Sequence, residues 1–419
     1  MTETALTQQT GRTRREIAIG IFFLAVAVLI FLLALGKSGM TSTFVLTSLR
    51  AGVEIRAPDL VLPTAISLYV LAGLTLLAAA WQLVRGFERS TLMIALIAGT
   101  AILAFLIWAS QDKSLNFTGM LVSSVVRATP IAFAALSGLY SERSGVVNIA
   151  IEGMMLLGAF MAVVFASISG NLFIGLIGGI LSGVLLGLLH AVLSIRYRVD
   201  QIVSGAAIII LALGTTSYLQ RSVLNTNPEL NQPGPAIAAV AIPGLSKIPV
   251  IGPVLFNQSP VIYFLFFLLI ATQVLMYRTR WGLRVRSVGE HPKAADTLGI
   301  NVFRTRYMSV LISGAIAGLA GAYMSIGAAG RFNEGMSAGK GFLGLAAMIF
   351  GNWNSGGAFL GSLIFGFFDS WQEKLSILQV GIPVDLLGMA PYLATMLVLA
   401  GIVGRARMPA ADGQPYVKE

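Results

Sequence analysis

Long apolar runs constrain the fold of this chain more than any other feature. A helix needs about 20 apolar residues to cross about 30 Å of hydrocarbon. Only 11% of the 419 residues are charged, against about 25% in an ordinary soluble domain, which excludes a soluble or disordered protein. We predict an all-α polytopic membrane protein with about ten transmembrane helices, over 17–35, 61–84, 91–108, 119–139, 148–168, 172–195, 201–219, 261–277, 307–327 and 385–403.

Two further apolar stretches, 341–351 and 356–370, are each too short to cross. The polar segment Gly-Asn-Trp-Asn-Ser-Gly-Gly at 351–357 separates them. Backbone that enters the hydrocarbon without crossing it must be covered by protein or line a wet cavity. We interpret this region as a re-entrant hairpin.

The distribution of Lys and Arg predicts the orientation. The net charge is +10, but the aromatic residues lie inside apolar runs, which argues against nucleic-acid binding. With the N-terminus inside, cytoplasmic segments carry 18 of the 28 basic residues and outer segments carry nine. The positive-inside rule then places both termini in the cytoplasm. The first run is longer than the core of about 7–15 residues in a signal peptide, so we expect an uncleaved anchor.

Two hydrophilic segments separate the later runs. Residues 220–260, expected outside, hold seven of the 15 prolines. Residues 278–306, expected inside, hold seven basic and two acidic residues. Pro292 suits a helix N-terminus, and apolar residues follow it at near-helical spacing, so we expect a short surface helix there.

The sequence offers little for catalysis or metal binding. It contains no cysteine, and its two histidines, His190 and His291, lie 101 positions apart, which disfavours a histidine-ligated metal. Residues 335–341 superficially resemble a phosphate loop but lack its glycine spacing and the Ser or Thr after Lys340. We expect a non-catalytic subunit that binds no metal or cofactor itself, with His190 at the membrane interface.

Three polar residues fall within or at the start of membrane runs. Arg127 lies three residues before Pro130 and is either functional, as ionisable groups at this depth tend to be, or bonded to carbonyls freed by the proline. Asn148 and Glu152 are four residues apart, on one face of a helix start. They either line a pathway at a broken helix or belong to an ordinary cytoplasmic turn.

Two glycine patterns also stand out. A stripe at every fourth residue, formed by Gly175, Gly179, Gly183 and Gly187, predicts a groove that admits another helix backbone. The tripeptide Glu-Gly-Met at 152–154 recurs at 334–336. Such a recurrence suits an inverted repeat, although chance explains so short a match.

Four segments together resemble the permease subunits of bacterial ABC importers in the branched-chain amino acid and simple-sugar group, most closely the nucleoside-uptake branch. They lie at 129–136, 141–160, 282–300 and 334–342, and the second and fourth are the most specific. The resemblance covers 116–405, as a permease core. Residues 1–115, with three runs, are then an N-terminal extension, and 406–419 are a cytoplasmic tail.

The resemblance implies the ABC importer permease fold, in the lipid of a bacterial plasma (inner) membrane, carrying a small-molecule solute. It implies an ABC ATPase subunit that binds ATP and Mg, a second permease subunit in a heterodimer, and an extracytoplasmic substrate-binding lipoprotein. In this family a cytoplasmic loop docks the ATPase. Its pattern falls here on Glu290, Ala294, Ala295 and Gly299, with Arg284 and Asp296 beside them. His291-Pro-Lys after Glu290 departs from the Glu-Ala-Ala form of other importers.

Our interpretation is a nucleoside permease subunit, with an aromatic face at its outer mouth on which a base stacks. The alternatives are a permease for simple sugars or branched-chain amino acids, and an ion-coupled carrier. A carrier should place several charges in mid-span, where this sequence offers chiefly one Arg and one Glu. The candidate pathway residues are Arg127, Asn148 and Glu152, with Phe332, Asn333 and Glu334 at the mouth.

Overall fold

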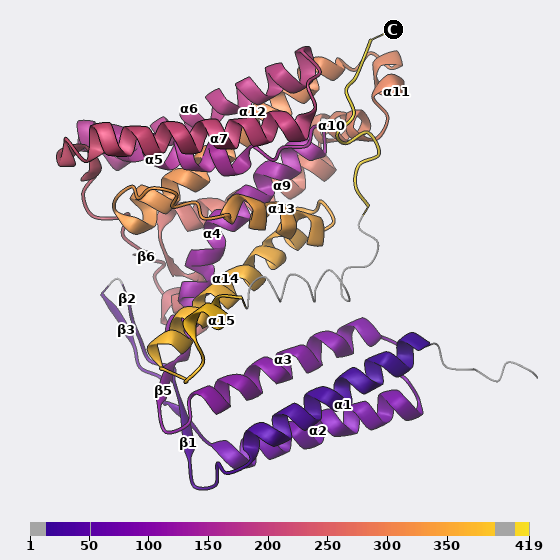
Figure 1. Cartoon of the computed structure of the whole chain (residues 1–419), viewed down its shortest axis with the longest axis vertical. Coiled ribbons are helices and arrows are strands. Elements are labelled where there is room, and N and C mark those ends of the chain that lie inside the picture. Colours follow the sequence, from indigo (N-terminus) through magenta and orange to yellow (C-terminus); the bar gives the residue numbers. More distant parts are fainter. Residues whose placement is uncertain (1–13, 51, 390–406, 419) are drawn as a thin grey trace, which may run out of the picture.

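The computed structural model describes residues 14–50, 52–389 and 407–418, and helices dominate it (Figure 1). Within these ranges nine helices are long and apolar enough to cross a membrane, and they coincide with the first nine predicted runs. The predicted run at 385–403 lies largely outside the described residues, which show only α15 (Val384–Gly388) at its start. The nine are α1 (Arg14–Ala34), α2 (Thr64–Val84), α3 (Ser90–Ala109), α4 (Phe117–Glu142), α5 (Ile151–Ser169), α6 (Leu172–Ala191), α7 (Gln201–Leu219), α9 (Pro260–Arg278) and α12 (Val302–Ala322).

These helices turn large apolar side chains outward. Phe173 is 73% exposed, Ile210 71% and Leu77 68%. Soluble proteins rarely expose apolar surface on this scale, whereas lipid tails cover it without cost. The outer surface therefore confirms the prediction of a polytopic membrane protein.

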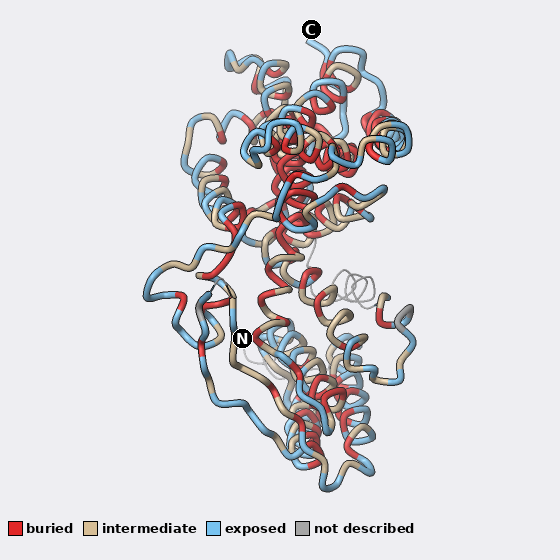
Figure 2. The backbone as a smooth tube through the Cα atoms, turned by 90° about the vertical axis from the view of Figure 1, so that its left-hand side faces the viewer, coloured by how far each residue is buried: buried red, intermediate tan, exposed pale blue. Residues whose placement is uncertain are grey.

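The first three helices form a smaller part of the molecule with a core of its own (Figure 1). α1 packs along α2 and α3, and Phe23, Ile30 and Leu68 are buried between them. Figure 2 shows this second group of buried residues at the lower end, apart from the larger group above. Met120, Phe367 and Trp371 from later in the chain also pack into this core.

Short strands, which the apolar runs do not predict, connect the two parts. β4 (Leu60–Pro63), β1 (Thr41–Val45) and β5 (Ser114–Asn116) form a sheet in that order, with β1 antiparallel to β4 and parallel to β5. Residues 61–63, predicted as the start of a transmembrane run, belong to β4 because they pair with β1. Several residues of β1 have β-branched side chains, which favour strands. Two further ribbons pair β2 (Ser48–Arg50) with β3 (Val53–Ile55), and β6 (Val240–Ala241) with β7 (Asn257–Gln258).

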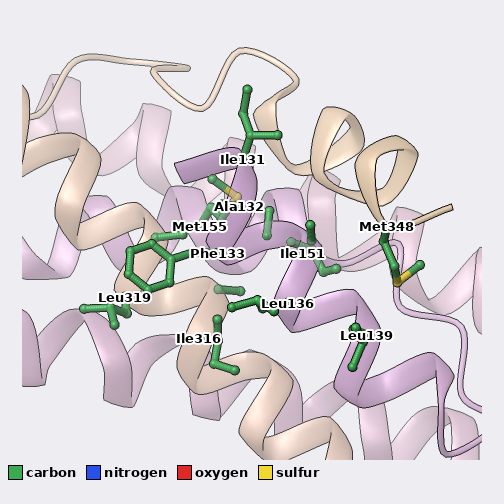
Figure 3. Packing of buried hydrophobic residues seen from close by; sticks show 14 of the residues in the cluster. Ile131, Ala132, Phe133, Leu136, Leu139, Ile151, Met155, Ile316, Leu319 and Met348 are labelled. Carbon is green, nitrogen blue, oxygen red and sulfur yellow. The ribbon is translucent and has the colours of Figure 1, made fainter. Parts of the chain in front are cut away.

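The larger part is built around α4, α5, α6 and α12. Figure 3 shows Phe133 of α4 beside Met155 of α5 and Leu319 of α12. The glycine stripe on α6 is a packing surface here: a Cβ at Gly183 would lie 2.2 Å from the carbonyl oxygen of Gly314 on α12. Only glycine permits so close an approach of two backbones.

The region predicted as a re-entrant hairpin instead reaches from one end of α4 to the other. α13 (Lys340–Phe350) and α14 (Ser355–Ile377) are joined by a turn whose Trp353 carbonyl accepts from Arg143, directly after α4. Beyond the other end of α14, the carbonyl of Leu378 accepts from Lys113, which precedes α4. α14 therefore runs antiparallel along the whole of α4, and its 23 residues make about 35 Å of helix, enough to cross.

The predicted second arm, 356–370, ends seven residues before α14 does, because the sequence analysis ended the arm where charged residues begin. Asp369 and Glu373 both pair with Arg127 of α4, so the helix continues through them. α13 is the short arm, with 11 residues, and turns and extended backbone at 331–339 precede it. This arm is a broken helix.

On the side expected to be cytoplasmic, the short helix predicted at Pro292 is present, and a second short helix that was not predicted precedes it. α10 (Arg280–Glu290) and α11 (Pro292–Thr297) meet at His291, whose Nδ1 accepts from the amide of Ala294 and caps α11. The tail 407–418 lies against these helices (Figure 1). Next to β7, the remaining helix, α8 (Ile251–Leu255), packs on α4.

His190 is not at the membrane interface as expected. Its side chain is fully buried, and its ring nitrogens lie 3.1 Å from Ser204 Oγ on α7 and 2.9 Å from the carbonyl oxygen of Val147. The ring therefore ties α6 to α7 and to the segment before α5. Its two polar partners explain why it is tolerated inside the helix pack.

Candidate functional site

A cavity of about 500 Å³ opens between α4, the π-helix Tyr323–Ala329 that continues α12, and the start of α13. Its polar wall is formed by Arg50, Arg127, Lys340 and Glu373, and its apolar wall includes Val122, Val126 and Met324. A cavity of this size holds a small solute, and the mixture of apolar surface with a few polar groups is typical of ligand sites. Arg127 is the one candidate pathway residue predicted from sequence that lines it.

Arg127 contacts carboxylates rather than freed carbonyls. Its Nη1 lies 3.1 Å from Asp369 Oδ2, and its Nη2 lies 3.1 Å from Glu373 Oε2. Both carboxylates come from α14, where a spacing of four residues puts them on one face. Sequence analysis did not identify these two carboxylates. The available signal was the need of a mid-span arginine for an anionic partner, together with two acidic residues four positions apart at the end of an apolar run.

Asn148 and Glu152 do not share a helix face as predicted. Asn148 precedes α5, is fully buried, and donates from Nδ2 to Ser313 Oγ at 2.9 Å, midway along α12. Glu152 lies in the first turn of α5, and its two carboxylate oxygens accept from the amides of Gly339 and Gly341 at 2.8 and 2.6 Å. The two side chains therefore contact different helices, and neither lines the 500 Å³ cavity.

These contacts bring the start of α5 and the start of α13 together. α5 starts at the depth of Ser313, and α13 starts where Glu152 receives its amides. A carboxylate stabilises the positive end of a helix. Discontinuous helices such as α13 are common at transport sites, and Lys340 at the start of α13 faces the cavity.

The predicted aromatic mouth is wrong at Phe332. This side chain has no exposed surface, and its ring packs edge-on against Phe160 with centroids 5.2 Å apart. Asn231 fixes its backbone, accepting from the Phe332 amide at 2.7 Å and donating to its carbonyl at 3.0 Å. Phe332 is a core residue and offers no face to a base.

The other two candidate residues of the mouth, Asn333 and Glu334, are exposed. Glu334 pairs with Arg221 at 3.1 Å, and hydrogen bonds from Ser217 and Arg221 lower the pKa of its carboxyl group. Asn333 and Glu334 therefore remain available at the surface, with Glu334 already carrying a cationic partner.

The candidate coupling residues fall into two groups. Arg284, Ala294 and Gly299 are exposed, whereas Ala295 is buried under the tail. Glu290 Oε2 accepts from the amide of Ala410 at 3.2 Å, and Asp296 lies 3.7 Å from Lys418 Nζ.

The tail, which contacts Glu290 and Asp296, was expected only as a cytoplasmic segment after the last helix. Arg306 of α12 donates to the carbonyl of Gln414 at 2.9 Å, and Tyr416 packs on Phe303. Asp412 is buried beside Glu142 and Arg306, and burial raises the pKa of its carboxyl group to about 7. The tail thus lies on the same face as the candidate coupling residues.

Comparison with known proteins decides the family. Residues 120–404 match the family model described as "Branched-chain amino acid transport system / permease component". The chain belongs to this family. No solved structure matches it.

Relatives match along nearly their whole length. The guanosine ABC transporter permease protein NupQ of Bacillus subtilis (strain 168) is 41% identical over 313 residues, 71% of this chain and 95% of that protein. The nucleoside ABC transporter permease protein NupC of Lactococcus lactis subsp. cremoris (strain MG1363) is 39% identical, over 71% of this chain and 96% of its own. A putative glucose ABC transporter permease protein of Haloferax volcanii is 30% identical over 72% and 98%.

Proposed function

We propose that this chain is the translocating subunit of an ATP-driven importer for nucleosides. The observation that carries the proposal is its identity of 41% and 39% to two permeases named for guanosine and nucleosides, over nearly all of each. The cavity is compatible with such a solute, because its apolar wall suits a base and its polar groups suit hydroxyls. Partial desolvation at several weak contacts also permits release.

The importer has further subunits in this proposal. An ABC ATPase hydrolyses ATP and docks at α10 and α11, a second permease completes a heterodimer, and a lipoprotein delivers the solute outside. Asn333 and Glu334 lie at the outer mouth, and both termini are cytoplasmic. Asn148 and Glu152 act by fixing the starts of α5 and α13 rather than by lining the cavity.

Uptake into proteoliposomes tests this function. The chain is reconstituted with an ABC ATPase, a second permease and a binding lipoprotein from the same organism, and accumulation of labelled inosine is followed with and without internal ATP. We expect ATP-dependent uptake that excess unlabelled nucleoside abolishes and excess glucose or leucine does not. ATP-dependent uptake of glucose or leucine, with none of any nucleoside, would overturn the assignment of the solute.

One observation favours an ion-coupled carrier as the second candidate. Together with Arg127, the carboxylates of Asp369 and Glu373 put three charges in the helix pack, more than the sequence suggested. A carrier would accumulate solute on an imposed proton or sodium gradient without ATP. We expect no such uptake, because each carboxylate is already ion-paired with Arg127.

A further inference from the structure

The cavity receives one wall residue from outside the region shared with the family. The family model begins at residue 120, yet Arg50, at the end of β2, lines the cavity together with Arg127 and Glu373. The N-terminal extension therefore contributes directly to the candidate solute site.

The β2–β3 hairpin that carries Arg50 is fastened to the larger part. Asn257 of β7 is fully buried, and its Nδ2 donates to the backbone carbonyl of Arg50 at 2.8 Å. Ile55 of β3 is 6% exposed, and β3 contacts the 3₁₀ turn Leu245–Lys247. These contacts fix the backbone of Arg50 at the cavity rim.

The side chain of Arg50 has unused hydrogen-bonding capacity. Its Nη1 is buried and has no hydrogen-bond partner among the described residues, whereas both terminal nitrogens of Arg127 bind carboxylates. Burial lowers the pKa of Arg50, but a guanidinium remains charged at neutral pH. A buried cationic donor without an acceptor is costly, and a bound acceptor removes that cost.

We propose that Arg50 is a solute-contacting residue of the cavity and favours solutes that present two adjacent hydrogen-bond acceptors. A guanidinium presents parallel N–H groups in a rigid fork that matches such a pair. The inference rests on the proposed function. Among nucleosides, the O6 and N7 edge of a 6-oxopurine supplies the two acceptors, whereas the N6 amino group of adenine is a donor. A carboxylate presents the same chemistry, so an amino acid is the rival source.

The test compares inosine with adenosine in the reconstituted importer, each at a concentration that saturates the binding lipoprotein. Because the lipoprotein is the same for every variant, a change in the ratio of the two uptake rates reports on the permease. We expect Arg50→Gln to lower inosine uptake about tenfold or more and adenosine uptake much less. Arg50→Lys, which keeps the charge without the fork, should also lose most of the preference.

Arg56 gives a matched control. It lies just after the same hairpin, its side chain is 84% exposed, and it pairs with Glu54 at 2.9 Å, so Arg56→Gln should leave both rates unchanged. An inosine-to-adenosine ratio that stays at the wild-type value in both Arg50 variants, at matched membrane levels, overturns the inference alone. ATP-dependent uptake of leucine by the wild type, with no nucleoside uptake, overturns the proposed function together with it.

Discussion

At the scale of single residues, the buried polar groups fix places where helices break. Glu152 accepts two amides at the start of α13, and Asn148 donates to Ser313 beside the start of α5. Backbone amides at a helix start have no acceptor within the helix, and no water is available inside the membrane to accept their hydrogen bonds. A carboxylate that accepts two of them therefore replaces the missing partners and complements the helix dipole.

Replacing Glu152 tests this role. In Glu152→Gln an amide NH₂ takes the place of one accepting oxygen and faces a backbone N–H, so one charge-assisted bond is lost, at about 1.5–3 kcal/mol. We expect a lower melting temperature in detergent and impaired uptake at matched membrane levels. Glu88→Gln, at an exposed position between α2 and α3, is the control. Wild-type melting and uptake in Glu152→Gln would refute the capping role.

Arg127 holds two carboxylates that would otherwise repel each other. Arg127→Gln should destabilise the chain by about 1–2 kcal/mol, less than a fully buried pair because roughly a third of each side chain is exposed. Uptake should fall as well. Adding Asp369→Asn and Glu373→Gln to this variant removes the stranded charges and should restore the melting temperature. A triple variant no more stable than Arg127→Gln would show that the loss has another cause.

At the scale of elements, close backbone contact sets the distance between α6 and α12. Gly183 and Gly314 touch at a separation that no side chain permits. Since lipid gives no hydrophobic drive for helix association, such packing is a main source of stability in a membrane protein. The position of α12 also fixes Ser313, which receives Asn148.

A single added methyl group tests this contact. In Gly183→Ala the new Cβ would lie 2.2 Å from the Gly314 carbonyl oxygen, whereas at Gly214 on α7 nothing lies within 4 Å. We expect Gly183→Ala to lower stability by about 1–3 kcal/mol through overpacking, and Gly214→Ala to leave it nearly unchanged. Thermal unfolding of both purified variants makes the comparison. Equal melting temperatures would refute the tight contact.

The tail forms a second element-scale contact, and its docking should depend on pH. Asp412 faces Glu142 of α4 and Arg306 of α12, and burial raises the pKa of Asp412 to about 7, above the usual value of about 4 for an exposed aspartate. The docked tail therefore binds the proton more tightly than the released tail. Its stabilisation is complete below about pH 4 and is lost as the pH rises through about 7.

Cleavage by trypsin after Arg407, followed by mass spectrometry, measures release of the tail. We expect the rate for the wild type to rise between pH 6 and pH 8 relative to that for Asp412→Asn, whose neutral amide does not titrate. The variant also corrects for the pH dependence of trypsin itself. Parallel rates for the two proteins across this range would contradict titration of Asp412.

At the scale of the whole molecule, the sequence predicted the positions of the long helices that contact lipid. The first nine apolar runs match the nine long helices, because their outward faces must be apolar over a full crossing. α14 was predicted too short, because its two carboxylates pair with Arg127 and only the fold brings these three residues together. Phe332 was misassigned since a buried aromatic and an exposed one look alike in sequence. The docking of the tail was not predicted because its partners, such as Gly289 and Arg306, are distant in sequence.

The orientation of the whole molecule is the remaining prediction, and it rests on the excess of Lys and Arg in the segments expected inside. The chain has no cysteine, so single introduced cysteines are clean probes. Leu298 at the end of α11 is 81% exposed, and Gln232 in the outer loop is exposed. Its neighbour Asn231 is a poorer probe because it clamps Phe332.

In intact spheroplasts a membrane-impermeant thiol reagent should label Gln232→Cys and spare Leu298→Cys. Permeabilised membranes should label both, which shows that each site is reactive. Labelling of position 298 and not of 232 in intact spheroplasts would show that the orientation is the reverse of the predicted one. Inversion would place α10, α11 and the tail outside, where no ATPase reaches them, so this measurement also tests whether that face is able to couple to ATP hydrolysis.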